Sequence, residues 1–155
     1  MRIRHAMWVS LLSLLIVALF VIGGVVVASW RRPELGPVDG NLRTCPDSPN
    51  CVCSYETDKQ HGIEPLSGGE DSMEQLRQVL ASKQGIVVIA DEGDYIRAEC
   101  TSRLMRYIDD IEFLNDAEAG VIHVRSASRV GHSDLGANRN RVEEIRRRLA
   151  EETVD

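Results

Sequence analysis

The chain has 155 residues, and its 18 basic and 24 acidic side chains give a formal net charge of −6 at pH 7. This length accommodates one membrane helix and one small domain. Residues 1–32 contain four of the arginines and no acid, so the remainder has 14 basic and 24 acidic groups and a net charge of −10. Such a domain is repelled by phosphate-rich surfaces, which argues against nucleic acid or an anionic leaflet as its partner.

The N-terminal region is strongly apolar. Residues 6–29 carry no charged side chain and consist mainly of Leu, Val, Ile and Ala. As an α-helix they would be about 36 Å long, enough to cross a hydrocarbon core of about 30 Å. Trp8 and Trp30 lie near the two ends, where indole rings favour the membrane interface. The sequence therefore predicts a membrane anchor within residues 1–32.

A cleavable signal peptide is the alternative, because residues 1–5 form a basic N-terminal region with Arg2 and Arg4, and Ala28 could precede a cleavage site. The apolar run is longer than the usual signal core of about 7–15 residues, which favours an uncleaved anchor. Arginines flank both ends of the run, so charge alone does not set its orientation.

Three further regions follow the anchor. Residues 33–41 contain two prolines and two glycines and are predicted to form an extended tether. The folded domain is expected over residues 42–150, followed by a short tail at 151–155. No internal repeat or low-complexity tract is present in the sequence.

The periodicity of the apolar residues predicts two helices and four strands. A helix over 71–83 places four apolar side chains on one face, with Ser72 and Gln75 suited to a capping box. A second helix is expected from about residue 138 or 140 to 151. Strands are predicted at 86–90, 95–101, 104–114 and 121–130. This order predicts an α+β fold in which a four-stranded antiparallel sheet is covered by two helices on one face.

The four cysteines bear on the compartment. Cys45 and Cys51 are separated by a turn-forming segment that could bring them within bonding reach, whereas Cys51 and Cys53 would diverge on an extended chain. Cys100 falls on the apolar side of a strand and is expected in the core. Because an anchor followed by a small domain favours an oxidising compartment, we predict a Cys45–Cys51 disulfide and an extracytoplasmic domain. Four reduced thiols in the cytosol are the alternative.

Two motifs carry a resemblance to a known family: CPDSPNCV at residues 45–52 and the polar block at 125–139. Between them lie YIRAE at 95–99 and YIDDIEF at 107–113. In this order, over roughly residues 45–149, the chain resembles the bacterial and plastid family catalogued as domain of unknown function 1499. The resemblance implies a fold and no activity, because the family has no established one. Cys53, where the family tends to have Ser, and His132, where it often has Tyr, are therefore poor candidates for a shared function.

Strand alternation places charged side chains together on the sheet face away from the helices. One interpretation is a solvated face with cross-strand ion pairs. The other is a polar cleft in which Glu99 and Asp110 position Arg125 and Arg129 for an anionic ligand. The candidate residues, whether they bind a ligand or stabilise the structure, are Glu99, Asp109, Asp110, Arg125, Arg129, Asp134, Asn138 and Arg139.

The loop at 131–136 has the glycine spacing of a phosphate loop but lacks the Lys-Ser/Thr that should follow. Asp134 and Asn138 are instead expected to lock this turn, and Arg139 to bond a carboxylate or carbonyl. No serine lies in the sequence context of a nucleophile elbow. No two histidines have the helical spacing of a metal-binding pair, and neither a metal nor a cofactor is predicted.

These observations lead to a functional hypothesis. The chain is expected to be a single-pass protein of the inner or plasma membrane whose extracytoplasmic domain binds a small anionic ligand or scaffolds a protein partner. The pattern favours binding over catalysis. A hydrolase that uses Glu99 with Asp109 or Asp110 in the same cleft is the alternative.

Overall fold

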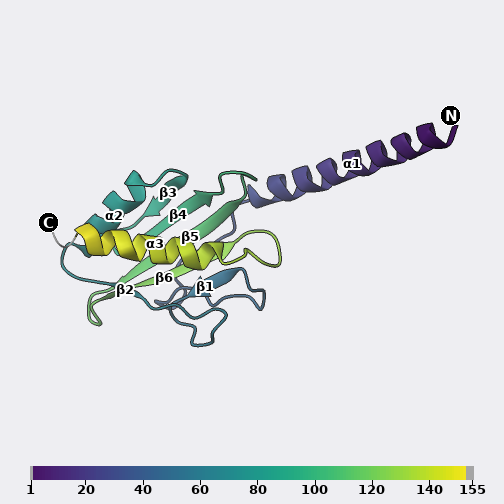
Figure 1. Ribbon diagram of the computed structural model, residues 1–155. Coiled ribbons are helices and arrows are strands. Elements are labelled where there is room, and N and C mark those ends of the chain that lie inside the picture. The colour runs from purple at the N-terminus through teal and green to yellow at the C-terminus, as the bar shows by residue number, and fades with distance from the viewer. Residues whose placement is uncertain (1, 153–155) are drawn as a thin grey trace.

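The computed structural model describes residues 2–152 and has an α+β fold with an N-terminal helix that extends away from the domain (Figure 1). The elements are α1 (Arg2–Ser29), β1 (Cys51–Cys53), β2 (Leu66–Ser67), α2 (Ser72–Ser82), β3 (Ile86–Asp91), β4 (Tyr95–Thr101), β5 (Ile108–Asp116), β6 (Val121–Ser128) and α3 (Ala137–Glu152). Most of the predicted tail at 151–155 lies outside the described residues.

Helix α1 is apolar and projects from one end of the domain. Within it, Leu11–Ser29 is long and apolar enough to cross a membrane, and a signal sequence would have the same properties. This stretch of 19 residues corresponds to about 28 Å of helix. Its large side chains are exposed, as Phe20 at 78% shows, so the domain does not use them for its own core.

All strands belong to one antiparallel sheet in the order β1-β6-β5-β4-β3, and β2 pairs with β6 beside β1. The sheet therefore has six strands, and the prediction of four was wrong. The two extra strands have three and two residues, too few for alternation to be visible in the sequence. Both form because β6 supplies their hydrogen-bond partners along one edge.

The β4–β5 connection also differs from the prediction. The third predicted strand was expected to begin at Leu104, but β5 begins at Ile108. The preceding residues form a turn in which Arg106 has a φ of 58°, a left-handed conformation that ends strand geometry.

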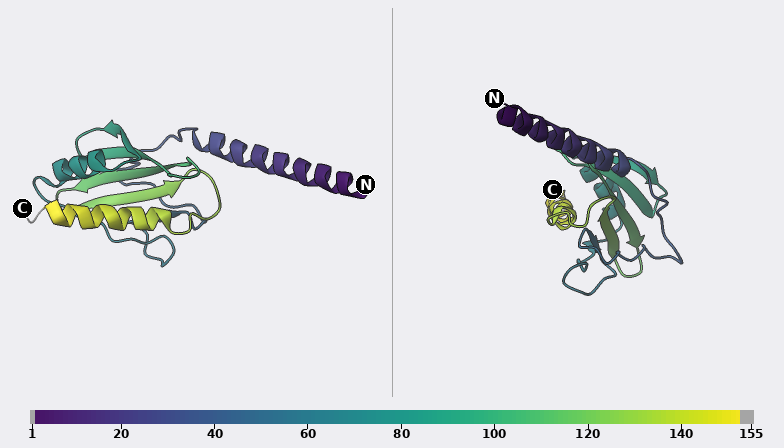
Figure 2. Two further views of the ribbon diagram at one scale, coloured as in Figure 1. Left: turned by 45° about the horizontal axis from the view of Figure 1, so that its top comes forward. Right: turned by 90° about the vertical axis from the view of Figure 1, so that its right-hand side faces the viewer.

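Helices α2 and α3 cover one face of the sheet (Figure 2). The core between these layers consists mainly of Leu76, Leu80, Val142 and Ile145 from the helices and Ile96, Ile111, Phe113, Ile122 and Val124 from the strands. The predicted capping box is absent from α2. Ser72 instead bonds through its hydroxyl to the backbone of Gly69, and the N-cap residue Asp71 makes no side-chain cap bond.

The opposite face of the sheet is contacted by the segment that links α1 to β1. The amide of Gly36 donates a hydrogen bond to Glu112 on β5, and the carbonyl of Arg43 lies 3.8 Å from the sulfur of Cys53. Leu42 is buried in the same region. The segment expected to be a tether therefore lies partly against the sheet, next to its charged side chains.

Candidate functional site

Seven of the eight candidate residues form two clusters on opposite faces of the sheet, and Arg139 belongs to neither. Consecutive residues of a strand point to opposite sides. Asp110 therefore faces the side away from the helices, and its neighbour Asp109 bonds Arg141 of α3 on the helical side. We use the name outer cluster for Glu99, Asp110, Arg125 and Arg129 with their bonding partners. We use the name inner cluster for Asp109, Asp134 and Asn138 with theirs.

Arg129 is at the centre of the outer cluster. Its Nε donates to Asp110 Oδ2 at 2.6 Å, and its Nη2 donates to Glu99 Oε1 at 2.7 Å. Its Nη1 donates to the main-chain carbonyl of Ser29, the last residue of α1, at 3.1 Å. The side chain is only 4% exposed. All three guanidinium nitrogens are therefore bonded within the protein.

Two further arginines surround the same carboxylates. Arg97 Nη2 donates to Asp110 Oδ1 at 2.7 Å, and Arg32 Nε donates to Glu99 Oε1 at 2.7 Å. The hydrogen bond from Arg32, followed by that from Arg129, lowers the pKa of Glu99 from 4.5 to about 2. Asp110 and Glu99 in turn raise the pKa of Arg129. Glu99 and Arg129 therefore stay charged across the physiological range of pH.

Glu112 and Arg125 form a second part of the outer cluster. They are opposite each other in the β5–β6 register, with Nη1 of Arg125 3.2 Å from Glu112 Oε2. Glu112 is fully buried and accepts further bonds from the Tyr95 hydroxyl at 2.8 Å and the Gly36 amide at 3.0 Å. Burial, followed by the charge of Glu112, raises the pKa of Tyr95. Arg125 Nε is buried and has no bond partner among the described residues.

Asn138 is at the centre of the inner cluster. Its Nδ2 donates to the carbonyl of Asn50 at 2.9 Å, and its Oδ1 accepts from Ser126 at 2.7 Å and from Arg141 at 2.5 Å. Arg141 also bonds Asp109 at 2.6 Å. These contacts join the start of α3 to β5, to β6 and to the residue before β1.

Asp134 and Arg139 act at the start of α3. Asp134 accepts hydrogen bonds from the amides of Gly136 at 3.0 Å and Asn138 at 2.7 Å, which is the role of a helix cap. Arg139 lies apart from the other candidates and donates to the carbonyl of Gln60 at 3.1 Å.

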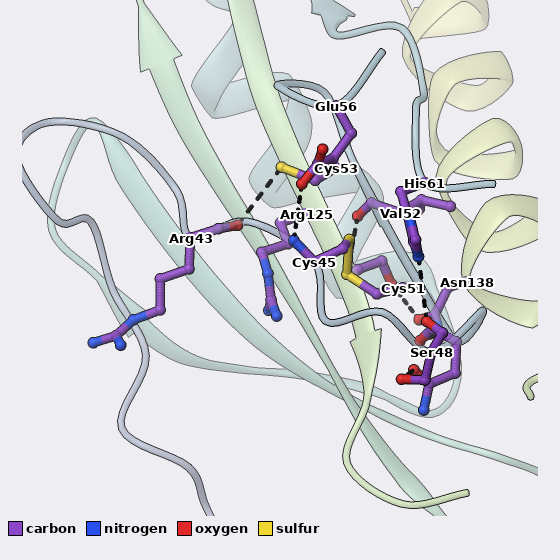
Figure 3. The surroundings of a disulfide bond; sticks show 12 residues. Arg43, Cys45, Ser48, Cys51, Val52, Cys53, Glu56, His61, Arg125 and Asn138 are labelled. Carbon is purple, nitrogen blue, oxygen red and sulfur yellow. Dashed lines mark hydrogen bonds between the residues drawn. A yellow bond between two sulfur atoms is a disulfide. The ribbon is translucent and has the colours of Figure 1, made fainter. Parts of the chain in front are cut away.

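A disulfide joins Cys45 to Cys51, as predicted from the sequence (Figure 3). The bridge attaches the segment that crosses the outer cluster to the edge strand β1. Cys53 and Cys100 are free and buried. Burial raises the pKa of the Cys53 thiol, and it raises that of Cys100 to about 11. Neither thiol is therefore activated as a nucleophile.

Residues 41–149 match the model of a family described as "Protein of unknown function (DUF1499)". The chain belongs to the DUF1499 family. The matched range includes Glu99, Asp110 and Arg129 but begins after Ser29 and Arg32, which complete the outer cluster. A search of the curated proteins finds no significant match, and a search of the solved structures finds none.

The DUF1499 domain also contains a serine–histidine pair that the sequence did not reveal. Ser54 Oγ lies 3.0 Å from His123 Nδ1, and Asp116 lies 3.8 Å from the other ring nitrogen. Tyr55 stacks on the same imidazole at 4.1 Å, and burial lowers the pKa of His123. The two partners are separated by 69 residues and meet only because Ser54 follows β1 alongside β6.

This pair has the atoms of a nucleophile and a base, and Ser54 borders a cavity of about 510 Å³. However, Ser54 Oγ also accepts a hydrogen bond from the amide of Val124 at 3.0 Å. The hydroxyl therefore links β6 to the chain after β1. This geometry is suited to holding the two segments together.

Proposed function

We propose that this protein is a single-pass membrane protein whose DUF1499 domain lies outside the cytoplasm, in a fixed orientation on its anchor helix. In this position it scaffolds a partner at the membrane. The observation that carries the proposal is the bonding of Arg129 to the end of α1 and to two strands of the sheet.

The junction between α1 and the sheet supports a fixed orientation. The last carbonyls of a helix have no partner within the helix, and a cation near them is stabilising. Arg129 supplies that cation to the carbonyl of Ser29. The hydroxyl of Ser29 accepts a second hydrogen bond from the amide of Ile108 at 3.2 Å. A domain that needed only to remain near the membrane would not require bonds to the helix end both from β5 and from the residue that follows β6.

The disulfide supports an extracytoplasmic location. Cytosolic reductants keep most thiols reduced, whereas structural disulfides persist in oxidising compartments. The Cys45–Cys51 bridge lies on the segment between α1 and the sheet, where it limits the freedom of the chain that follows the anchor.

The outer cluster favours scaffolding over recognition of a small anion. Arg129 is bonded to Asp110 and Glu99, so an anion would have to displace carboxylates that are already paired. The hydrolase alternative needs a carboxyl group that can donate a proton near neutral pH. Glu99, with a pKa of about 2, is ionised there and is a poor general acid.

Pulsed electron paramagnetic resonance on the full chain in lipid nanodiscs tests the fixed orientation. Spin labels on Phe20 of α1 and Glu118 of the β5–β6 turn should give one narrow distance distribution. Arg129→Ala should broaden it, whereas Arg147→Ala, which removes an exposed pair with Glu151, should not. A broad distribution in the unaltered chain would show a freely tethered domain and refute the proposal.

A further inference from the structure

The end of the domain next to α1 exposes large apolar side chains. Leu104 is 89% exposed in the β4–β5 connection, and Leu135 is 94% exposed in the β6–α3 connection. Both connections lie at the end from which α1 projects (Figure 1). Single exposed leucines are common on soluble proteins, but these two lie in the two connections nearest the base of an apolar helix.

Both connections are joined to the end of α1. The β4–β5 connection leads into Ile108, whose amide donates to Ser29 Oγ, and the β6–α3 connection begins at Arg129, which donates to the Ser29 carbonyl. A cavity of about 560 Å³ opens between these connections and the helix. Its apolar lining includes Val25, Leu104, Met105, Tyr107 and Val130.

The position of Val25 indicates the depth of this cavity. Val25 precedes Ser29 by four residues, which is about 6 Å along a helix. If Leu11–Ser29 spans the hydrocarbon, as the proposed function requires, Val25 lies inside its outer edge. Trp30, 58% exposed, then lies at the interface, where tryptophan is favoured. Side chains that share a cavity with Val25 are therefore close to the boundary between the hydrocarbon and the lipid headgroups.

The charges at this end are also suited to lipid. Arg103 and Arg106 flank Leu104 and are exposed, and neither has a carboxylate partner among the described residues. The nearby acids are engaged, because Asp109 bonds Arg141 and Asp134 caps α3. Exposed charges more than about 10 Å away are largely screened, so the charges close to this end, and not the net charge of the whole domain, govern its interaction with lipid phosphates.

We propose that these connections, residues 102–107 and 130–136, form a lipid-contacting surface whose occupant is the phospholipid of the anchoring membrane. Leu104 and Leu135 enter the interfacial region, Arg103 and Arg106 bond lipid phosphates, and lipid hydrocarbon fills the cavity beside Val25. The surface rests on the proposed membrane anchorage and adds that the domain itself contacts the leaflet. It would keep this end of the domain against the membrane. The β5–β6 turn is at the other end of the strands, about 30 Å away.

Fluorescence quenching in reconstituted vesicles tests the surface. Single cysteines at Leu104, Leu135, Phe20 or Glu118 of the full chain carry an environment-sensitive dye, and phosphatidylcholine with a quencher at known acyl-chain depths forms the bilayer. The unaltered chain, whose free cysteines are buried, measures background labelling. Dyes at Leu104 and Leu135 should be quenched several-fold more than the dye at Glu118, most strongly by shallow quenchers.

The dyes at Phe20 on α1 and at Glu118 in the β5–β6 turn distinguish failure of the membrane anchorage from failure of the lipid-contacting surface. An unquenched dye at Phe20 would show that α1 does not span the bilayer, and it would overturn both the anchorage and the surface. If the dye at Phe20 is quenched but the dyes at Leu104 and Leu135 are quenched no more than the dye at Glu118, the lipid-contacting surface alone is overturned.

The arginines are tested with the double variant Arg103→Gln/Arg106→Gln, which leaves the apolar side chains in place. Addition of phosphatidylglycerol to the vesicles should increase quenching at Leu104 in the parent chain and leave the double variant unchanged. An equal response of the two chains to the anionic lipid would refute the role of the arginines.

Discussion

Arg129 donates a hydrogen bond to the carbonyl of Ser29 across 100 residues of chain, and so connects the end of α1 to the charged face of the sheet. The same guanidinium bonds Asp110 on β5 and Glu99 on β4. One buried cation therefore determines how three elements meet, and its removal should have large consequences.

Arg129→Ala should lower the free energy of unfolding by about 3–5 kcal/mol, because it leaves two carboxylates near a buried site without their central partner. Arg129→Lys should recover part of the loss, since lysine keeps the charge but lacks the planar fork of donors. Chemical denaturation of the full chain in detergent measures both. The exposed pair of Arg147 with Glu151 provides the control, and Arg147→Ala should change stability by less than about 0.5 kcal/mol. A loss of similar size in the two alanine variants would contradict the central role of Arg129.

Glu99 should contribute a pH-dependent part of the stability. Its pKa in the folded chain is lowered from 4.5 to about 2, mainly by the hydrogen bond from Arg32 and then by Arg129. Because the folded state holds the proton less tightly than the unfolded state, the contribution is complete above about pH 4.5 and is lost as the pH falls towards 2. Thermal unfolding of the parent chain and Glu99→Gln across this window should show a shallower decline in the variant. Parallel curves would rule out Glu99 as a source of the acid sensitivity.

The disulfide gives a prediction about the native compartment. In protein isolated from its native membrane under acid quench, Cys45 and Cys51 should resist alkylation until reduction, whereas Cys53 and Cys100 should react once the chain is unfolded. Mass spectrometry distinguishes the four positions. The pair Cys45→Ser/Cys51→Ser should reduce stability by about 2 kcal/mol, as expected for a short closed loop. Free thiols at both positions would place the domain in a reducing compartment.

Asn138 and Asn140 form a matched pair of substitutions at the start of α3. Asn138 is fully buried and bonds Asn50, Ser126 and Arg141, whereas Asn140 is exposed. Asn138→Ala should cost about 2–4 kcal/mol, because it leaves a buried carbonyl and hydroxyl with fewer partners. Asn140→Ala should be nearly neutral. Equal effects in denaturant titrations would show that the inner cluster is not a stabilising network.

Ser54 should be structural and unreactive. A fluorophosphonate probe, which labels activated serines, should leave the protein unmodified, since Ser54 Oγ already accepts the amide hydrogen of Val124. Ser54→Ala should reduce stability by about 1 kcal/mol. Covalent labelling that disappears in Ser54→Ala and in His123→Ala would instead identify a catalytic pair and favour an enzyme.

Much of the local structure could be predicted from the order of the residues. Period-two alternation put Arg97 and Glu99 on one face of β4, and the register of β4 with β5 then places Glu99 opposite Asp110. The turn-forming residues between Cys45 and Cys51 predicted the bridge that the structure contains. These features depend on neighbours in the chain or on one periodic strand, so composition and spacing are sufficient to detect them.

Short strands and partners distant in sequence could not be predicted in the same way. β1 and β2 have too few residues for a visible pattern and exist because β6 offers them an edge. Asp109 and Asp110 are adjacent in the sequence, but the pleat of β5 sends them to separate clusters on the two faces of the sheet.

An apolar N-terminal helix, an α+β domain, a disulfide and a set of charged residues on strands could all be inferred from the order of the residues. Which of these charges meet depends on the tertiary structure. Arg129 reaches Ser29, and Ser54 reaches His123, because the chain returns along β6 after long intervals. Such pairings depend on strand order and on the path of the segment after α1, which arise from the packing of the whole domain and leave no local periodic signal.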